Sequence, residues 1–274
     1  MAKTGHGNHW ECVVELNKAV QEIVPSVLQN GSKIEKSEVI ANCFENKIPT
    51  TTKILSISDD NEITPKILVA ENPEEQIYEV VTGYPFIQSK SIIKLKIIEI
   101  NEWENLIEAV ITGETKDKEK ISFFDTNYFL NKETYEIGKI YDFSISAMAY
   151  AVEILEETSF SFEGQNAIDW HAKLGEEPIY DESGNIEPVV IHLDNLVALI
   201  QADEDYPDDA EFQSPIKSMK TIRAFDQDFY KFKITVFRDP DIDIDLYAKA
   251  DFFNRKPKIN YPLRGYIWLQ GKKE

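Results

Sequence analysis

The first regular pattern along the chain is helical. Apolar residues recur at spacings of three and four from Trp10 to Leu28, a stripe typical of the buried face of an α-helix. The stripe predicts a helix over residues 10–30 that is kinked or divided at Pro25, because proline disrupts a helix interior. Asn30-Gly31 is a suitable end, since glycine favours the backbone conformation that closes many helices.

The remaining N-terminal segments carry shorter signals. Apolar positions predict a second short helix over 37–46, and residues 48–57 have the composition of an extended segment. Residues 1–9 are mostly polar, so we expect them to form a flexible start. Residues 62–87 contain prolines at 65, 73 and 85, which argue against long elements there.

Beyond residue 87 the pattern changes to the short alternating runs of β-strands. A first group of predicted strands covers 92–100, 106–111, 121–124 and 140–145. A second group covers 216–225, 229–237 and 261–271. Between the groups we predict a strand at 189–191, a helix or strand at 194–200 and an acidic loop at 203–209.

The two groups share an order of features. Each opens on a Gln-Ser pair, continues through two strands, carries a double phenylalanine beside an aspartate and ends on a Tyr/Gly strand. The matched features are Gln88-Ser89 with Gln213-Ser214, Phe123-Phe124-Asp125 with Asp251-Phe252-Phe253, and 135–150 with 261–271. We therefore predict that 88–150 and 212–271 are two copies of one β unit that superpose.

Short strands in this order, with polar turns and a glycine near the end of a strand, resemble the OB-fold, a five-stranded Greek-key barrel. The resemblance implies a mainly β (β-rich α+β) protein with two OB-like antiparallel β-barrel modules and a small N-terminal helical region. The expected domains are an N-terminal helical/mixed region 1–87, a first barrel-like module 88–158, an acidic linker 159–211 and a second barrel-like module 212–274. OB-fold proteins commonly bind oligonucleotides or oligosaccharides on one face, so the resemblance also implies such a face.

The distribution of charge along the chain bears on which partner the protein could bind. The net charge of −20 is unevenly spread: residues 159–202 hold 1 basic and 8 acidic residues, net −7, whereas 212–273 hold 13 basic and 7 acidic, net +6. A strongly acidic body repels polyanions and attracts basic partners. The same charge also serves solubility alone.

Composition sets further limits. The chain of 274 residues with 42% hydrophobic residues is long enough to bury a full core and to form two domains. The 2 cysteines do not make a disulfide framework, and no apolar run is long enough to cross a bilayer. A cytoplasmic protein without membrane association is the resulting expectation.

Two residue clusters are candidate metal sites. His6, His9 and Cys12, with Cys43 further along, are of the types that bind zinc. We expect no zinc, because these residues adjoin the flexible start. Alternation places Asp241, Asp243 and Asp245 on one strand face, where carboxylates can hold calcium or magnesium. An ordinary solvated face is the favoured interpretation of the three aspartates.

A third cluster, Asp169, His171 and His192, has the groups of a general acid–base pair. No serine or cysteine in the setting of a nucleophile accompanies these residues, so we interpret the histidines as structural. The sequence also has no glycine-rich phosphate-binding loop.

The C-terminal module mixes aromatic and basic residues, which is how proteins hold nucleic-acid strands without reading bases. A β-barrel core also consumes aromatic side chains, so both interpretations stay open. The predicted binding residues are Arg223, Lys231, Lys233, Arg238, Tyr247, Arg255, Arg264, Tyr266 and Trp268.

These features together predict a non-enzymatic binding protein without cofactor or bound metal. The leading hypothesis is an acidic protein-interaction module, of inhibitor or immunity type, that acts on a basic partner. One alternative is single-stranded nucleic-acid binding through the C-terminal OB-like module. A second alternative is a metal-dependent hydrolase.

Overall fold

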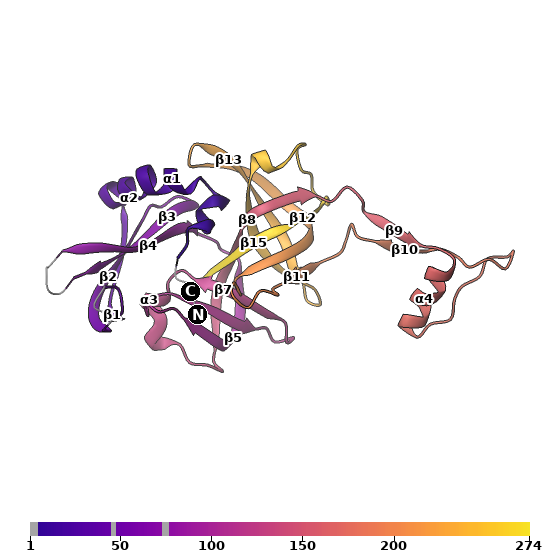
Figure 1. Ribbon diagram of the computed structural model, residues 1–274, viewed down its shortest axis with the longest axis horizontal. Coiled ribbons are helices and arrows are strands. Elements are labelled where there is room, and N and C mark those ends of the chain that lie inside the picture. The colour runs from indigo at the N-terminus through magenta and orange to yellow at the C-terminus, as the bar shows by residue number, and fades with distance from the viewer. Residues whose placement is uncertain (1–4, 45–47, 73–76) are drawn as a thin grey trace.

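The computed structural model describes residues 5–44, 48–72 and 77–274 (Figure 1). The protein is mainly β, with 51% of residues in strands and 15% in helices, which confirms the predicted class. A four-stranded antiparallel sheet lies beside the N-terminal helices, and a nine-stranded mixed sheet forms the centre. A two-stranded ribbon with one helix projects away from both sheets (Figure 1).

The predicted N-terminal helix is present but divided. It consists of a 3-10 helix, Asn8–Cys12, then α1, Leu16–Lys18, a π-helical turn, Ala19–Ile23, and α2, Val24–Asn30. The extended backbone at Glu15 makes the break, whereas Pro25 lies in the first turn of α2, where a missing N–H is tolerated. No helix of the described residues has the length and apolarity needed to span a membrane.

The expectation of a flexible start is wrong for the part of it that the structure describes. His6 and His9 are buried, 3% and 4% exposed, and they pack in a cluster that includes Trp103, Phe124 and Trp268. Burial of the Trp10 ring nearby gives the segment an apolar anchor. Residues 1–4 lie outside the described residues.

The four-stranded sheet follows chain order: β1, Lys33–Ala41; β2, Thr50–Ser58; β3, Ile63–Glu71; and β4, Tyr78–Ile87. β2 confirms the predicted extended segment. The helix predicted over 37–46 is wrong, because residues up to Ala41 belong to β1 and 45–47 lie outside the described residues. β1 buries alternate residues, Val39 and Ala41, against Ile54, and this pairing overrides a weak local helical spacing.

The prolines of 62–87 do not shorten the strands as expected. Pro65 and Pro85 face each other across β3 and β4. β2 ends its pairing with β3 at Lys66, and β4 is the outermost strand of this sheet. A proline nitrogen has no hydrogen to donate, and at these two positions no further strand requires such a donor. Pro73 lies outside the described residues.

The nine-stranded sheet draws its strands from both halves of the chain. From the first come β5, Ile92–Glu102; β6, Ala109–Glu114; β7, Lys120–Asp125; and β8, Ile140–Ile154. From the second come β11, Ala198–Ile200; β12, Asp209–Ala224; β13, Gln227–Phe237; β14, Ile242–Lys249; and β15, Pro262–Lys273. Short helices precede β8 (α3, Tyr128–Asn131, and a 3-10 turn, Lys132–Thr134) and β15 (a 3-10 turn, Ala250–Phe252).

Pairing in this sheet closes two circuits that share the antiparallel pair β8–β15. The first circuit runs β5, β6, β7, β15, β8 and returns to β5. The second runs β12, β13, β14, β8, β15 and returns to β12. β7, the third strand of the first half, pairs in parallel with β15, the last strand of the second half. In the same way β14, the third strand of the second half, pairs in parallel with β8, the last strand of the first half. Corresponding strands therefore have corresponding neighbours in the two halves.

Two of the three residue matches that suggested the repeat do not occupy corresponding places, whereas the third, 135–150 with 261–271, falls on the corresponding strands β8 and β15. Gln88-Ser89 lies before β5, whereas Gln213-Ser214 lies inside β12. Phe123-Phe124-Asp125 ends β7, whereas Asp251-Phe252-Phe253 lies in and after a 3-10 turn. The recurrence of these residue pairs reflects the composition of the chain. The two halves correspond instead in the order in which their strands pair. Superposition of the two halves stays a prediction.

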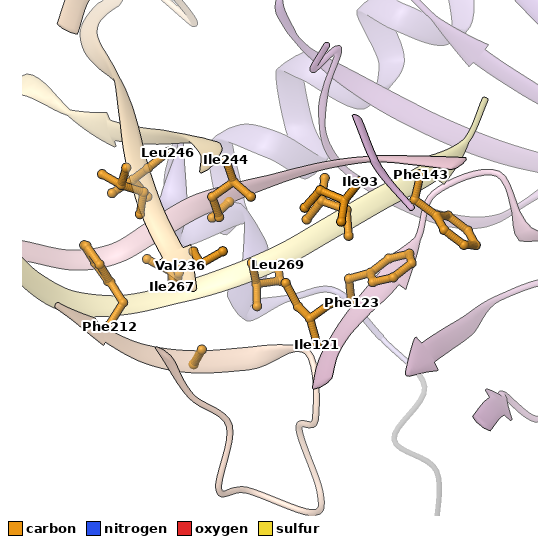
Figure 2. Close-up of a cluster of buried hydrophobic side chains, with 14 of the residues drawn as sticks. Ile93, Ile121, Phe123, Phe143, Phe212, Val236, Ile244, Leu246, Ile267 and Leu269 are labelled. Atoms are coloured by element: carbon orange, nitrogen blue, oxygen red, sulfur yellow. The ribbon is translucent and has the colours of Figure 1, made fainter. Parts of the chain in front are cut away.

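The largest core cluster contains side chains from both halves (Figure 2). Phe123 of β7 and Phe143 of β8 contact each other edge to face at 5.0 Å between ring centres. Leu246 of β14 and Leu269 of β15 belong to the same cluster and are fully buried. Burial of these residues stabilises the two halves as one apolar core.

Candidate functional site

The segment called the arm here, residues 159–192, projects from the body (Figure 1). It contains β9, Ser159–Phe162, paired antiparallel with β10, Val189–His192, and between them α4, Gln165–Leu174. A small packing unit holds it together: the Phe162 and Trp170 rings stack at 4.7 Å, and Ala167 is buried. The arm therefore has its own local structure while most of its surface meets solvent.

The surface of the arm is both acidic and apolar. Its residues carry 7 acidic and 1 basic side chain, for a net charge of −6. Within the described residues, Glu176 is the only arm carboxylate at ion-pairing distance from a basic side chain, with His171 Nδ1 at 3.4 Å. Large apolar side chains are also exposed, among them Leu174 and Tyr180, each 57% exposed. Exposed apolar patches with polar residues around them mark protein-interaction sites, and the arm exposes side chains of both kinds.

A cavity of about 820 Å³ lies beside the root of the arm. Leu196, Ile200 and Phe212 supply apolar walls, and Tyr266 and Arg264 supply polar ones. Ile200 belongs to β11, which pairs with β12 and ends the strand order of the sheet. The cavity therefore has apolar walls and is bordered by β11, the terminal strand in the order of the sheet.

The basic residues predicted to bind a partner are each matched by a carboxylate. The pairs are Arg223 with Asp228, Lys231 with Glu62 and Asp245, Lys233 with Asp245, Arg238 with Asp241, Arg255 with Glu156, and Arg264 with Glu153. Most of these pairs are exposed to solvent. Pairing of this kind lowers the local positive potential that a polyanion would meet.

Two of the three predicted aromatic residues are not available for stacking. Trp268 is fully buried, stacks on His9 at 4.0 Å between ring centres and donates Nε1–H to Asp208 Oδ2 at 2.8 Å. Tyr247 is buried as well. Tyr266 alone is exposed, at 37%, and its ring stacks on Tyr150. Of the two interpretations left open for these rings, the core interpretation holds for Trp268 and Tyr247, so their place among the predicted binding residues is not supported.

The structure does bring part of the predicted set together. Lys231, Lys233 and Tyr247 meet Asp245 and Glu62 where the two large sheets approach each other. Burial opposes ionisation of Glu62, but hydrogen bonds from Lys220, Lys231 and Tyr247 outweigh it and hold the Glu62 pKa at about 2.

A cavity of about 340 Å³ lies beside Lys231, Lys233 and Asp245. We call it the lysine pocket, and its polar lining includes Lys90, Ser91, Ser218, Lys220, Lys231 and Lys233. Sequence reasoning missed Lys90, Ser91 and Glu62, since they precede the C-terminal segment by more than a hundred residues.

A buried polar network lies under the N-terminal segment. His6 Nδ1 contacts His9 Nδ1 at 2.7 Å, and His6 Nε2 contacts Glu108 Oε1 at 2.8 Å. Burial, with the nearby His6 charge, lowers the pKa of His9 well below its ordinary value, and burial raises the pKa of Asp208. Glu108 and Asp208 gave no sequence signal, because each reaches the network from a distant strand end.

The zinc candidates do not converge as a set. Cys12 is fully buried and burial raises its pKa, which disfavours the thiolate that binds metal. Among residues 5–44, 48–72 and 77–274, no three His, Cys, Asp or Glu side chains are arranged to hold a metal ion. Absence of zinc in solution stays a prediction.

The other two clusters have ordinary partners. Lys217 Nζ lies 2.7 Å from both Asp241 and Asp243, so an ammonium group occupies the place a cation would take. Asp169 accepts a hydrogen bond from Gln165, and His171 is buried beside Glu176. His192 lies on β10 opposite Ser159. These contacts accord with structural roles.

No protein-family model matches this chain. Comparison with curated proteins and with solved structures gives no match either. Function therefore has to be inferred from the surfaces of the chain itself.

Proposed function

We propose that this chain is a non-enzymatic binding protein that engages a basic protein partner through the arm, in the manner of an inhibitor or immunity-type protein. The observation that carries the proposal is the arm itself, which presents exposed apolar side chains and carboxylates that, within the described residues and apart from Glu176, have no basic side chain at ion-pairing distance. Protein interfaces combine apolar anchors with polar groups that set orientation.

Charge supports a basic partner. The net charge of −20 attracts basic proteins over a distance, and the arm concentrates −6 of it where long-range attraction guides docking. The cavity beside the root of the arm offers an apolar socket for one side chain of the partner. Leu196 and Ile200 at its rim add exposed apolar surface.

We interpret the body as a scaffold of two OB-like barrel units. Each circuit of paired strands closes on itself, as a barrel requires, and the order of strands is the same in both halves. Because β8 and β15 belong to both circuits, the units are fused along one strand pair. The scaffold gives the arm a rigid base. Single-stranded nucleic-acid binding by the predicted residues has less support, since their charges are paired.

Deletion of the arm tests the proposal. Leu193 N–H donates to Thr158 O at 2.7 Å, so the two ends of the arm already meet. Replacing 159–192 by a short glycine linker should leave the body folded. Proteins captured from a cell extract by the immobilised full chain should be basic, should elute with salt and should be lost with the arm-deleted variant.

A charge variant separates the contribution of the carboxylates. Glu177→Gln, Glu182→Gln and Glu187→Gln remove three arm charges, whereas Glu104→Gln, Glu119→Gln and Glu136→Gln remove three from the body. We expect capture to weaken in the first variant and to persist in the second. Equal capture by all variants, or capture of no basic protein by the full chain, would sink the proposal.

A further inference from the structure

We propose that the lysine pocket is a binding site for a phosphate group, separate from the arm. The site lies between β12 and β13 and the connection from β4 to β5, Gln88–Ser91. Four lysines line it in a chain whose net charge is −20. A cluster of positive charges in so acidic a chain requires a physical explanation.

The pairing of strands makes the arrangement costly without a counter-charge. Lys220 and Lys231 are direct cross-strand partners. Like charges placed opposite each other destabilise a sheet, whereas opposite charges there stabilise it. Glu62 relieves the repulsion by accepting from Lys220 at 2.8 Å and from Lys231 at 2.6 Å. The chain thus maintains two facing ammonium groups by supplying a carboxylate from another sheet.

The charges do not cancel. Lys90, Lys220, Lys231 and Lys233 face the two carboxylates Glu62 and Asp245, which leaves a local excess of two positive charges. Within the described part of the chain, Lys90 has no ion-pair or hydrogen-bond partner for its ammonium group. Lys220, 54% exposed, uses only Glu62. Each ammonium carries three N–H donors, so several donors remain free.

These features fit a phosphate group. A phosphate monoester carries about −1.5 to −2 charges at neutral pH and has several acceptor oxygens, which matches the excess charge and the free donors. Ser91 and Ser218 add hydroxyl groups to the lining. The cavity of about 340 Å³ has room for roughly ten waters at about 30 Å³ each, enough for a phosphoryl group and part of its carrier. A small phosphorylated molecule and a nucleic-acid backbone both supply this chemistry.

The test is a calorimetric titration of the full chain with inorganic pyrophosphate. The variant Lys90→Gln/Lys220→Gln removes two positive charges without touching Lys231, which ties the sheets together. Because hydrogen bonds to charged groups are stronger than neutral ones, the affinity should fall about tenfold or more. Lys116→Gln/Lys256→Gln, two exposed lysines outside the pocket, is the matched control and should retain wild-type affinity.

A second titration with a single-stranded oligonucleotide distinguishes the sources. Tighter binding of the oligonucleotide, lost in Lys90→Gln/Lys220→Gln and falling steeply with salt, assigns the phosphate to nucleic acid. Tighter binding of pyrophosphate, lost in the same variant, assigns it to a small molecule. No binding of either probe by the wild-type chain, or an equal loss in the control variant, overturns the proposal.

Discussion

Glu62→Gln is expected to loosen the junction between the four-stranded and nine-stranded sheets. Glu62 directly precedes β3 and accepts hydrogen bonds from Lys220, Lys231 and Tyr247, on three neighbouring strands. Glutamine has nearly the same shape but no charge. The variant therefore leaves Lys220 and Lys231 opposite each other with little to offset their repulsion.

The magnitude follows from the pKa of Glu62, which falls from 4.5 to about 2. At about 1.4 kcal/mol for each pH unit, this lowering corresponds to about 3 kcal/mol when fully expressed. The side chain is 29% exposed, so solvent screens part of this, and we expect a loss of about 2 kcal/mol. For a chain of this length the melting temperature should fall by roughly 3 °C.

The dependence on pH gives the sharpest readout. Because the folded pKa lies below the unfolded value, the stabilisation is present above about pH 4.5 and disappears as the pH falls toward about 2. Urea denaturation at several pH values should show wild type and variant converging in acid. Glu104→Gln, an exposed residue on the same body, is the control and should match wild type throughout. Equal stability of Glu62→Gln and wild type at pH 7, or a gap that persists unchanged in acid, would refute the reasoning.

Three further outcomes are expected. Trp268→Phe should lower the free energy of unfolding by about 1–3 kcal/mol, measured by circular dichroism, because the buried Asp208 loses its donor; unchanged stability would contradict this. Gly265→Ala should prevent native folding or destabilise it severely, since an added Cβ would lie 2.2 Å from the Ala151 carbonyl oxygen, and a native-like melting curve would show the opposite. Burial raises the pKa of Cys43 to about 12, so in the folded chain its thiol should react with a disulfide reagent at pH 8 more than about tenfold more slowly than a free cysteine; reaction at the free rate would refute it.

Much of the secondary structure was readable from local pattern. Alternation of apolar residues predicted β5, β7, β10 and β15, and the helical stripe predicted the N-terminal helix, although the helix is broken at Glu15 and not at Pro25 as predicted. The short alternating runs predicted the mainly β class, and the distribution of charged residues predicted the acidity of the arm. These properties depend on residues near one another in the chain, or on sums over it.

Local pattern failed where distant partners decided the outcome. Residues 37–41 form a strand because β2 pairs with them, and the prolines of β3 and β4 are tolerated because no third strand needs their donors. The buried His6 meets Glu108 from 102 residues away and packs against Trp103 and Phe124. Nothing in the spacing around His6 signals that contact.

The candidate site divides in the same way. The sequence by itself determined that Lys231 and Lys233 point to one face of a strand and that the arm is acidic. Only the tertiary structure decided that Trp268 belongs to the core, that each predicted cation meets a carboxylate, that Lys90 lines the lysine pocket and that Glu62 bonds to two of its lysines. The physical reason is that burial and charge pairing depend on contacts between strands far apart in the chain, which periodicity along one strand does not encode.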